Sequence, residues 1–411
     1  MIYKNSKSFA DELDQQDPLK LYRGKFHYPK KENGEDTIYL CGNSLGLQPK
    51  SVRSFVEQEL VVWEKDGVKG QHGRWEEFHE RLAQSSANLV GAKKTEVVVM
   101  NALTVNLHFL LISFYQPNRK RNKIIIEKGA FPSDQYAVES QIKLHGFDPK
   151  ECLIELAPRK GEKTLRTDDI LQTIIKTGDE LATLIMGGVN YYTGQAFDMK
   201  TITEAGQSVG AYVGFDLAHA AGNLNLNLHD WNLDFAAWCT YKYLCAGPGA
   251  PSGIFIHERH HDWDGPRFAG WWGQNKQTRF EMGPNFDPIL TAEGWQVSNA
   301  PVMGMAPLLA SMEIFDEIGM ESVREKGDKL TGFLEYLLNE KTPNISIITP
   351  DERGCQLSLV IPGGKSVFEV ITEKGVVCDW REPDVIRIAP HPLFNSYSEI
   401  FQFVEILEKS L

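Results

Sequence analysis

Residues 210–222 read GAYVGFDLAHAAG, and residues 234–249 read DFAAWCTYKYLCAGPG. Each segment contains a short apolar run of the kind that forms a buried strand. Asp216 closes the first run, His219 follows three residues later, and Lys242 follows the second run. The carboxyl ends of parallel strands meet at one edge of a sheet, and ligands bind at that edge. The two segments therefore predict that a carboxylate, an imidazole and an amine converge there.

Similar apolar runs recur along the middle of the chain and alternate with helix-like segments. The strand-like runs are EVVVMN (96–101), KIIIEK (123–128), TLIMGGV (183–189), GAYVGFD (210–216), FAAWCTY (235–241) and GIFIH (253–257). The helix-like segments between them lie at 104–115, 133–145, 167–177 and 198–208. Continuous apolar strands that alternate with helices are typical of a mostly parallel sheet covered on both faces. We therefore expect an α/β fold.

The pattern changes near residue 306. Two amphipathic stretches (307–319 and 322–339) precede shorter strand-like runs, which is typical of a smaller α+β unit. The N-terminal segment is too short to bury a core alone, so we expect it to pack with this unit. The sequence thus predicts a large domain at 56–305 and a small domain formed by 1–55 and 306–411.

The charge balance and the cysteines limit the possible partners. The chain has 411 residues, with 43 Lys and Arg against 55 Asp and Glu and a formal net charge of -12. An acidic surface does not favour a general binder of nucleic acid or of acidic lipid. No signal peptide is recognisable, and no apolar stretch approaches the ~20 residues of a membrane helix. The cysteines are scattered, so we expect reduced thiols and a cytoplasmic protein, with neither nucleic acid nor membrane as partner.

One chemistry uses an amine, a carboxylate and an imidazole together, that of pyridoxal 5'-phosphate (PLP). A lysine amine condenses with its aldehyde, and a buried carboxylate keeps its ring nitrogen protonated so that the ring accepts electrons. Lys242 lies in the apolar context AAWCTYKYLCAG, where a charged amine is costly unless it has a function. Taken singly, Asp216 is an ordinary helix cap and Lys242 an ordinary solvated charge. Together they predict a PLP site, without a metal.

A PLP site also needs a cradle for the phosphate and a surface for the ring. NALTVN opens a predicted helix, where the N–H groups of Leu103 and Thr104 would hold a phosphate. In FPSD, Phe131 would stack on the ring, with Asp134 near its nitrogen. Thr104, Ser133 and Asp134 are equally good helix caps, and that interpretation stays open at this point.

Two short motifs of other enzyme classes also occur. HERHH (257–261) contains the H-E-x-x-H string of zinc proteases, but it follows a strand and meets Gly265 and Pro266, which break helices. GNSLG (42–46) contains the G-x-S-x-G string of serine hydrolases, but Pro49 delays the helix that should follow the serine at once. We therefore interpret the first as a charged turn and the second as a glycine turn.

Over nearly its whole length, the chain resembles the kynureninases, a family of PLP enzymes with the aspartate-aminotransferase type of fold. The matching strings are YLCGNSLGLQPK (39–50), MNALTVNLH (100–108), AFPSDQYAVESQ (130–141), YYTGQAFDMKTIT (191–203), VGFDLAHAAGN (213–223), WCTYKYLCAGPG (238–249), GWWG (270–273), VSNAP (297–301) and VIRIAPHPLFNS (385–396). The resemblance implies the PLP-dependent transferase fold type I, in which a large domain with a mostly parallel sheet is joined to a smaller α+β domain.

The resemblance also implies a role for the residue at each matching position. Lys242 would bind PLP covalently, and Tyr241 beside it would contact the phosphate and move protons. The other contacts to the cofactor would come from Leu103, Thr104, Phe131, Pro132, Ser133, Asp134, Asp216, His219, Trp271 and Asn299.

The residues for the substrate follow in the same way. Arg387 would bind the α-carboxylate as a two-pronged fork, a task that Arg suits and Lys does not. Asn299 would also reach the substrate, and Ser44 and His72 would lie near its aromatic end.

The activity that the resemblance implies is the hydrolytic cleavage of the Cβ–Cγ bond of L-kynurenine, which yields anthranilate and L-alanine. 3-Hydroxy-L-kynurenine would yield 3-hydroxyanthranilate, and the pathway would be tryptophan degradation or NAD biosynthesis. The resemblance also implies a homodimer with the active site at the subunit interface, so that Trp271 and Asn299 would reach across it.

Two points stay open. Kynureninases often carry a hydroxyl residue where this chain has Gly187, so one hydrogen bond to PLP is either missing or supplied by Asn190. The alternatives for function are another PLP lyase or desulfurase of the same fold type and, more remotely, a PLP-binding protein without turnover.

Overall fold

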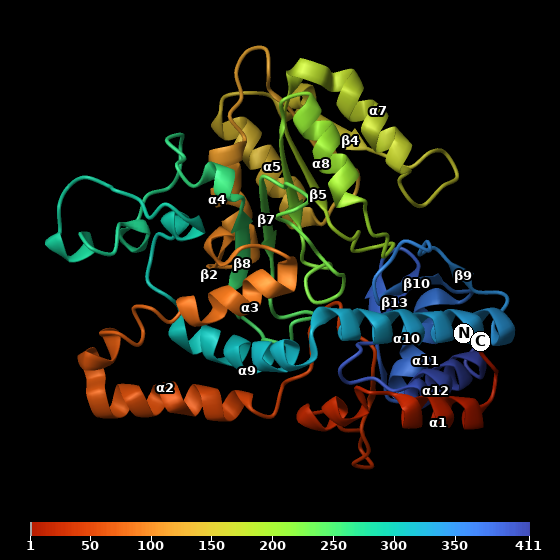
Figure 1. Ribbon diagram of the computed structural model, residues 1–411. Helices are drawn as coiled ribbons and strands as arrows, with labels where there is room; N and C mark the ends of the chain where they lie inside the picture. Colours follow the sequence, from red (N-terminus) through yellow and green to blue (C-terminus); the bar gives the residue numbers. More distant parts are fainter. Residues whose placement is uncertain (1) are drawn as a thin grey trace.

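A central sheet organises the larger part of the molecule (Figure 1). In the computed structural model, which describes residues 2–411, it has seven strands in the order β2-β8-β7-β6-β5-β3-β4. β8 runs antiparallel to β2 and β7, and the other neighbouring strands are parallel. The prediction of an α/β fold with a mostly parallel sheet is confirmed. The strands are β2 (Val97–Met100), β3 (Lys123–Glu127), β4 (Leu153–Leu156), β5 (Leu181–Gly187), β6 (Tyr212–Asp216), β7 (Phe235–Trp238) and β8 (Ser252–Ile256).

Both faces of this sheet are covered. Successive side chains of a strand point to opposite faces, so Val97 and Val99 enter one core while Val98 and Met100 enter another. This arrangement explains why the strands are continuous apolar runs in the sequence. The first core is covered by α3 (Glu80–Val90), α7 (Thr167–Thr177), α8 (Met199–Ser208) and α9 (Val302–Ile318). The second is covered by α4 (Leu103–Phe114), α5 (Pro132–Leu144) and the short α6 (Pro149–Cys152).

The remaining long helix of this part, α2 (Val52–Asp66), packs against α9 on the outside of the molecule (Figure 1). None of the helices within residues 2–411 combines the length and the apolar character that crossing a membrane requires.

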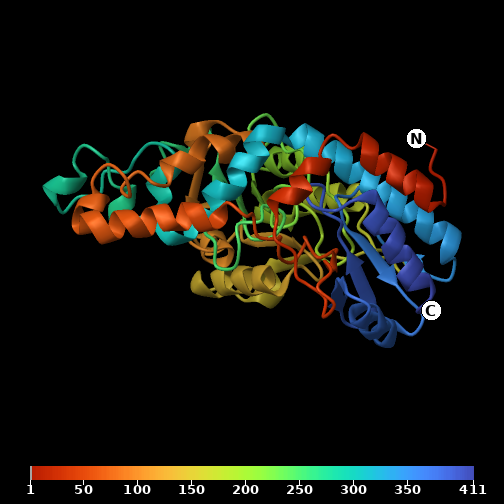
Figure 2. The same cartoon turned by 90° about the horizontal axis from the view of Figure 1, so that it is seen from below.

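The two ends of the chain pack together in a smaller unit, and both termini lie there (Figure 2). Their side chains share one core, for example Leu13, Leu40 and Phe403. The elements from the N-terminal end are α1 (Lys7–Gln16), which lies against α12, and β1 (Ile38–Tyr39), which pairs in parallel with β11. The others are α10 (Met320–Lys341), β9 (Ser346–Ile347), β10 (Leu357–Val360), α11 (Gly364–Glu373), β11 (Val376–Val377), β12 (Asp379–Arg381), β13 (Val385–Ile388) and α12 (Tyr397–Glu408). Strands β12, β13, β10 and β9 form an antiparallel sheet in that order.

The strand predicted at 235–241 ends earlier than expected. β7 stops at Trp238, and the following residues leave the sheet. The Thr240 hydroxyl donates to the carbonyl of Pro251 (2.7 Å), and the Thr240 carbonyl accepts the N–H of Ala246 (3.0 Å). These bonds replace strand pairing, so Lys242 lies in a loop beyond the strand.

The sequence patterns did not predict β4, α1 or α3. β4 is an edge strand in which Glu155 is exposed, so its sequence LIEL lacks the continuous apolar character of the inner strands.

His391 lies at the junction between the two parts of the molecule as a neutral imidazole. Its Nε2–H donates to the carbonyl of Tyr243 (2.8 Å), and its Nδ1 accepts the N–H of Leu393 (3.2 Å). Complete burial lowers its pKa to about 4. A proton on Nδ1 of His391 would face the N–H of Leu393, so His391 stays neutral in the folded protein. In the unfolded chain, the same imidazole takes up a proton near pH 6.5.

We therefore expect the fold to lose stability as the pH falls below 6.5, because the unfolded chain then binds more protons. His391 alone should account for about 2 kcal/mol between about pH 7 and pH 5. The free energy of unfolding in urea at the two pH values measures this effect. A His391→Gln variant should show the smaller pH dependence, and an equal dependence in both proteins would contradict the assignment.

Candidate active site

Strand ends and helix starts enclose a cavity of about 170 Å³ at one edge of the large sheet. β3, β5 and β6 end at this cavity with Glu127, Gly187 and Asp216, while α4 and α5 begin beside it. It lies at the edge where ligands are expected in such a sheet. The lining residues are Ala102, Leu103, Thr104, Glu127, Phe131, Ser133, Asp134, Gly187, Val189, Tyr191, Asp216, Ala218, His219, Tyr241 and Lys242.

The amine of Lys242 points into this cavity, and its Nζ lies 3.1 Å from Nε2 of His219. Burial, and next the charge of Lys242, hold the pKa of His219 well below its usual value. The imidazole is therefore neutral beside the amine. Asp216 is buried nearby, and its Oδ1 accepts the N–H of Ala218 (2.7 Å). The structure thus brings the predicted amine, imidazole and carboxylate to one cavity.

A second carboxyl group, that of Asp134 in the first turn of α5, faces Asp216. Burial raises the pKa of Asp134 well above the usual aspartate value, and the negative charge of Asp216 raises it further. Burial also raises the pKa of Asp216, but the positive charge of Lys242 opposes this. A proton shared by the two carboxyls therefore rests on Asp134 and leaves Asp216 as the anion.

The helices that begin at the cavity do so without side-chain caps. The N-cap residues are Ala102 for α4 and Phe131 for α5, and neither forms a side-chain cap hydrogen bond in the described structure. Thr104, Ser133 and Asp134 therefore do not have the capping role that the alternative interpretation gave them. The first N–H groups of α4, which include that of Leu103, remain available for an anion such as a phosphate.

Aromatic side chains form part of the cavity wall. The ring centroids of Phe131 and Tyr191 are 5.3 Å apart, with an interplanar angle of 85°. Nζ of Lys242 lies 5.7 Å from the centroid of Phe131 and 5.9 Å from that of Tyr241. Burial raises the pKa of the Tyr241 hydroxyl, so this group keeps its proton at neutral pH. Pro132 is the first residue of α5 and fixes the chain between Phe131 and the next lining residue.

These residues fit PLP. Nδ1 of His219 and Oδ1 of Asp134 are buried and have no hydrogen-bond partner within residues 2–411. An aldehyde needs an amine, a phosphate needs free N–H groups, and a pyridine nitrogen needs an acid. The cavity offers Lys242, the start of α4 and the pair of Asp134 and Asp216 for these tasks.

Arg387 lies outside the cavity lining but in contact with Tyr191, which is part of it. Its side chain is 1% exposed, its Nη1 donates to the carbonyl of Tyr191 (2.7 Å), and its Nη2 pairs with Asp379. Burial lowers the pKa of Arg387, and Asp379 counteracts the effect. Its buried Nε finds no acceptor among residues 2–411. Because each Nη carries two hydrogens, the fork keeps donors for a further carboxylate.

Four other predicted residues lie away from the cavity lining. Trp271 is in a short helix, η6 (Trp271–Gly273), within a segment that reaches far out from the sheet (Figure 1). Asn299 is exposed, and so is His72, with 73% of its side chain accessible. Ser44 lies in the turn that follows β1.

Among the lining residues that sequence reasoning missed, Glu127 and Tyr191 are the two with polar side chains. Glu127 ends β3 in the same way as Asp216 ends β6, so the position of a carboxyl at a strand end could have found it. Tyr191 lies in a loop and offered no comparable signal.

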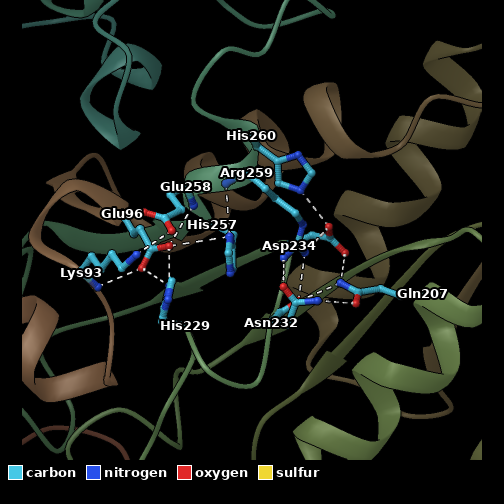
Figure 3. Close-up of polar contacts among 10 residues, drawn as sticks. All are labelled: Lys93, Glu96, Gln207, His229, Asn232, Asp234, His257, Glu258, Arg259 and His260. Atoms are coloured by element: carbon cyan, nitrogen blue, oxygen red, sulfur yellow. Dashed lines mark hydrogen bonds and ion pairs between the residues drawn. The ribbon is translucent and has the colours of Figure 1, made fainter.

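The H-E-x-x-H string lies at the opposite edge of the sheet, where its polar residues join one cluster around Glu96 and another around Asp234 (Figure 3). The backbone N–H of Arg259 links the two clusters by donating to Nδ1 of His257 (3.2 Å). Three residues of the string form the short helix η5 (Glu258–His260), and His257 is its N-cap. Glu96 is fully buried and accepts Nδ1–H of His229 (2.9 Å), whereas His260 pairs with Asp234 (2.8 Å). The string therefore does not present two histidines on one face of a long helix, and the charged turn agrees with the structure.

Known proteins resemble this chain over its full length. Residues 323–407 match the family model described as the kynureninase C-terminal domain. The chain is 52% identical to a kynureninase of Flavobacterium psychrophilum, over 100% of this chain and 99% of that one. It is 53% identical to a kynureninase of Koribacter versatilis, over 98% and 97%. It is 47% identical to a kynureninase of the animal Nematostella vectensis, over 98% and 93%.

Solved structures share the fold. A C-DES variant with glycine covalently linked to its PLP cofactor has a TM-score of 0.78 and 16% identity, over 94% of this chain and 98% of that one. A cysteine desulfurase of Escherichia coli has a TM-score of 0.76 and 15% identity, over 95% and 98%. These likenesses confirm the predicted PLP fold type I, and at such low identity they concern the fold alone.

Proposed function

The chain belongs to the kynureninase family, and we propose that its Lys242 cavity hydrolyses L-kynurenine to anthranilate and L-alanine. The protein is thus a PLP-dependent hydrolase of a carbon–carbon bond with a small-molecule substrate. One observation carries the assignment of residues: the Lys242 amine lies 3.1 Å from a neutral His219, in the cavity that also holds the Asp134–Asp216 pair.

The residues around the Lys242 amine would each hold, move or orient a different proton of the reaction. When bound, PLP supplies an aldehyde for amines and a protonated ring that accepts electrons from a neighbouring bond. Asp216, as the anion of its pair, would hold the proton on the ring nitrogen. Lys242 would first hold the cofactor and then, once the substrate amine replaces it, take the proton from the substrate α-carbon. His219 would accept a hydrogen bond from the amine and orient it.

The other groups would bind the reactants and return the proton. Leu103 and Thr104 would hold the phosphate through their N–H groups, and Phe131 would pack on the ring. Water would add to the ketone carbon of the substrate side chain, so that the acyl part leaves as anthranilate. Tyr241, whose raised pKa keeps its hydroxyl protonated, would donate a proton to the fragment that leaves as alanine.

We assign the α-carboxylate of the substrate to Arg387, whose guanidinium is oriented by Asp379 and the carbonyl of Tyr191. Arg387 lies on β13, among the elements formed by the two ends of the chain. We propose that the chain divides into two domains near the predicted bounds of 56–305 and of 1–55 with 306–411, with helices α2 and α9 belonging whole to the large domain. A bound substrate would then connect Arg387 of one domain with Lys242 of the other.

A homodimer would complete the site. The segment around Trp271 projects from the molecule (Figure 1). In this segment, Phe280 is 56% exposed and Met282 is 73% exposed. Large exposed apolar side chains on a projecting segment are typical of an interface. We propose that a second copy covers this segment, and that the copy's Trp271 and Asn299 then reach the cavity. Ser44 and His72 would lie near the aromatic end of the substrate in that assembly.

The cysteines bear on the location and on the desulfurase alternative. All six are free thiols in the described structure, and five of them are buried. Free thiols persist in reducing compartments, which supports our proposal of a cytoplasmic location. Within residues 2–411, no cysteine lines the cavity, whereas a desulfurase uses a reactive cysteine at its substrate.

The test is to incubate the purified holoprotein with L-kynurenine and to follow the fluorescence of anthranilate. We expect turnover on the order of 1 s⁻¹ or faster, and a parallel assay with 3-hydroxy-L-kynurenine ranks the two substrates. Release of sulfide from cysteine without any anthranilate would instead identify a desulfurase. PLP absorbance with no product from either substrate would identify a binding protein without turnover.

A further inference from the structure

Glu127 is a buried carboxyl at the cofactor cavity to which the reaction described above gives no task. It ends β3 and is 4% exposed. Its Oε1 accepts the N–H of Gly187 (3.0 Å), and its Oε2 accepts Nδ2 of Asn190 (2.7 Å). It also borders an adjoining cavity of about 230 Å³, so it forms part of the wall between the two.

Gly187 makes room for this carboxyl. A Cβ atom on residue 187 would lie 2.8 Å from Oε1 of Glu127, closer than real Cβ contacts come. Any side chain at this position would therefore displace the carboxyl or be displaced by it. Because residue 187 is glycine, the Glu127 carboxyl is the polar group at this part of the cavity wall.

Asn190 holds this carboxyl and does not line the cofactor cavity itself. Its Oδ1 accepts the N–H groups of Tyr192 (3.0 Å) and Thr193 (2.8 Å), and also the Thr193 hydroxyl (3.0 Å). These bonds fix which end of the amide is the oxygen, so Nδ2 always faces Glu127. Of the two alternatives for this position, the geometry does not support a hydrogen bond from Asn190 to PLP.

Glu127 adds a third carboxyl to a cavity that already contains the Asp134–Asp216 pair. Burial raises the pKa of Glu127, and the charge of Asp216 adds to this effect. The hydrogen bonds that Asn190 and Gly187 donate to its two oxygens oppose it, and they favour the ionised carboxylate. The ionisable groups around it are Asp216 of β6, Asp134 of α5, Lys242 and His219 beyond them, and Lys128 and Lys163 at the adjoining cavity.

We propose that Glu127 is a further residue of the cofactor site: its carboxylate stabilises the protonated form of bound PLP, and its place depends on Gly187 and Asn190. The inference rests on the proposed binding of PLP at Lys242. An anion a few ångströms from a titrating group stabilises its protonated form, and burial strengthens that effect. Glu127 acts through the electrostatic field alone, because no bond to it forms or breaks.

The test compares the parent holoenzyme with a Glu127→Gln variant by recording the visible spectrum of bound PLP across pH, together with the dissociation constant of PLP. We expect the spectroscopic midpoint to fall by about one pH unit, a tenfold loss of proton affinity. A Glu127→Asp variant keeps the charge and should shift less. Glu96→Gln removes an equally buried carboxylate at the opposite edge of the sheet (Figure 3) and should leave the midpoint unchanged.

Gly187→Ala, which adds a Cβ without a hydroxyl, tests the same claim by a second route, and it decides the matter where Glu127→Gln fails to fold. Its side chain should push the Glu127 carboxyl aside and lower the midpoint in the same direction. Added to Glu127→Gln, it should shift the midpoint little further. Parent-like midpoints in Glu127→Gln and Gly187→Ala would overturn the inference and leave the proposed function intact. A parent protein that binds no PLP would overturn both.

Discussion

Replacing Lys242 with alanine should abolish anthranilate formation, with kcat/KM lower by at least about 10⁴-fold. Lys242 supplies the amine that holds the cofactor and the base that takes the α-proton, and no other amine lines the cavity within residues 2–411. His219 cannot hold the cofactor, because an imidazole has no primary amine to condense with an aldehyde. Burial lowers the pKa of His219, so it is also a weak base for the α-proton. The visible absorbance of the protein with added PLP should disappear as well. Anthranilate fluorescence and the absorption spectrum measure the two effects.

The matched control is Lys143→Ala. Lys143 lies on α5, is 64% exposed and pairs with Glu139 on the same helix at 3.7 Å. This variant should retain the spectrum and the activity of the parent. An active, yellow Lys242→Ala protein would refute the role of Lys242.

Replacing Arg387 with lysine should raise KM roughly 10- to 100-fold and change kcat much less. The guanidinium donates to the Tyr191 carbonyl and to Asp379 at the same time, and it keeps further hydrogens in the same plane for a carboxylate. A lysine ammonium is a single point and cannot reproduce this fork. The amine chemistry at Lys242 would stay intact, so the PLP spectrum should not change.

Arg381→Lys is the control for that prediction. Arg381 pairs with the same Asp379 carboxylate at 3.1 Å, but its side chain is 37% exposed. A role confined to stabilising Asp379 would make the two substitutions similar in effect. A KM that is unchanged in Arg387→Lys, or raised equally in both variants, would count against the assignment of the α-carboxylate.

Strand ends were the most informative part of the sequence. Asp216 and Lys242 could be placed together because apolar runs show where buried strands end, and parallel strands end at one edge. The same signal was present at Glu127 but was not used. The cap interpretation of Thr104 could not be excluded from sequence, because a helix start that binds an anion and one that is capped look alike.

Long-range pairing was beyond the sequence patterns. Arg387 and Asp379 meet because β12 and β13 pair in antiparallel register, which the sequence between them does not fix. Gly187 leaves room for Glu127 because β5 and β3 lie side by side in the sheet, although they are far apart in the sequence. Trp271 and Asn299 do not line the cavity of their own chain, so resemblance to a family predicted their role and local patterns did not.

The most direct test of the central claim is to identify the lysine that carries PLP. Borohydride treatment of the holoprotein fixes the cofactor to the amine that holds it, and mass spectrometry of the digested chain locates the modified residue. We expect the phosphopyridoxyl group on Lys242, in the peptide that contains TYKYLCAG. Modification of another lysine, or of none, would contradict the account.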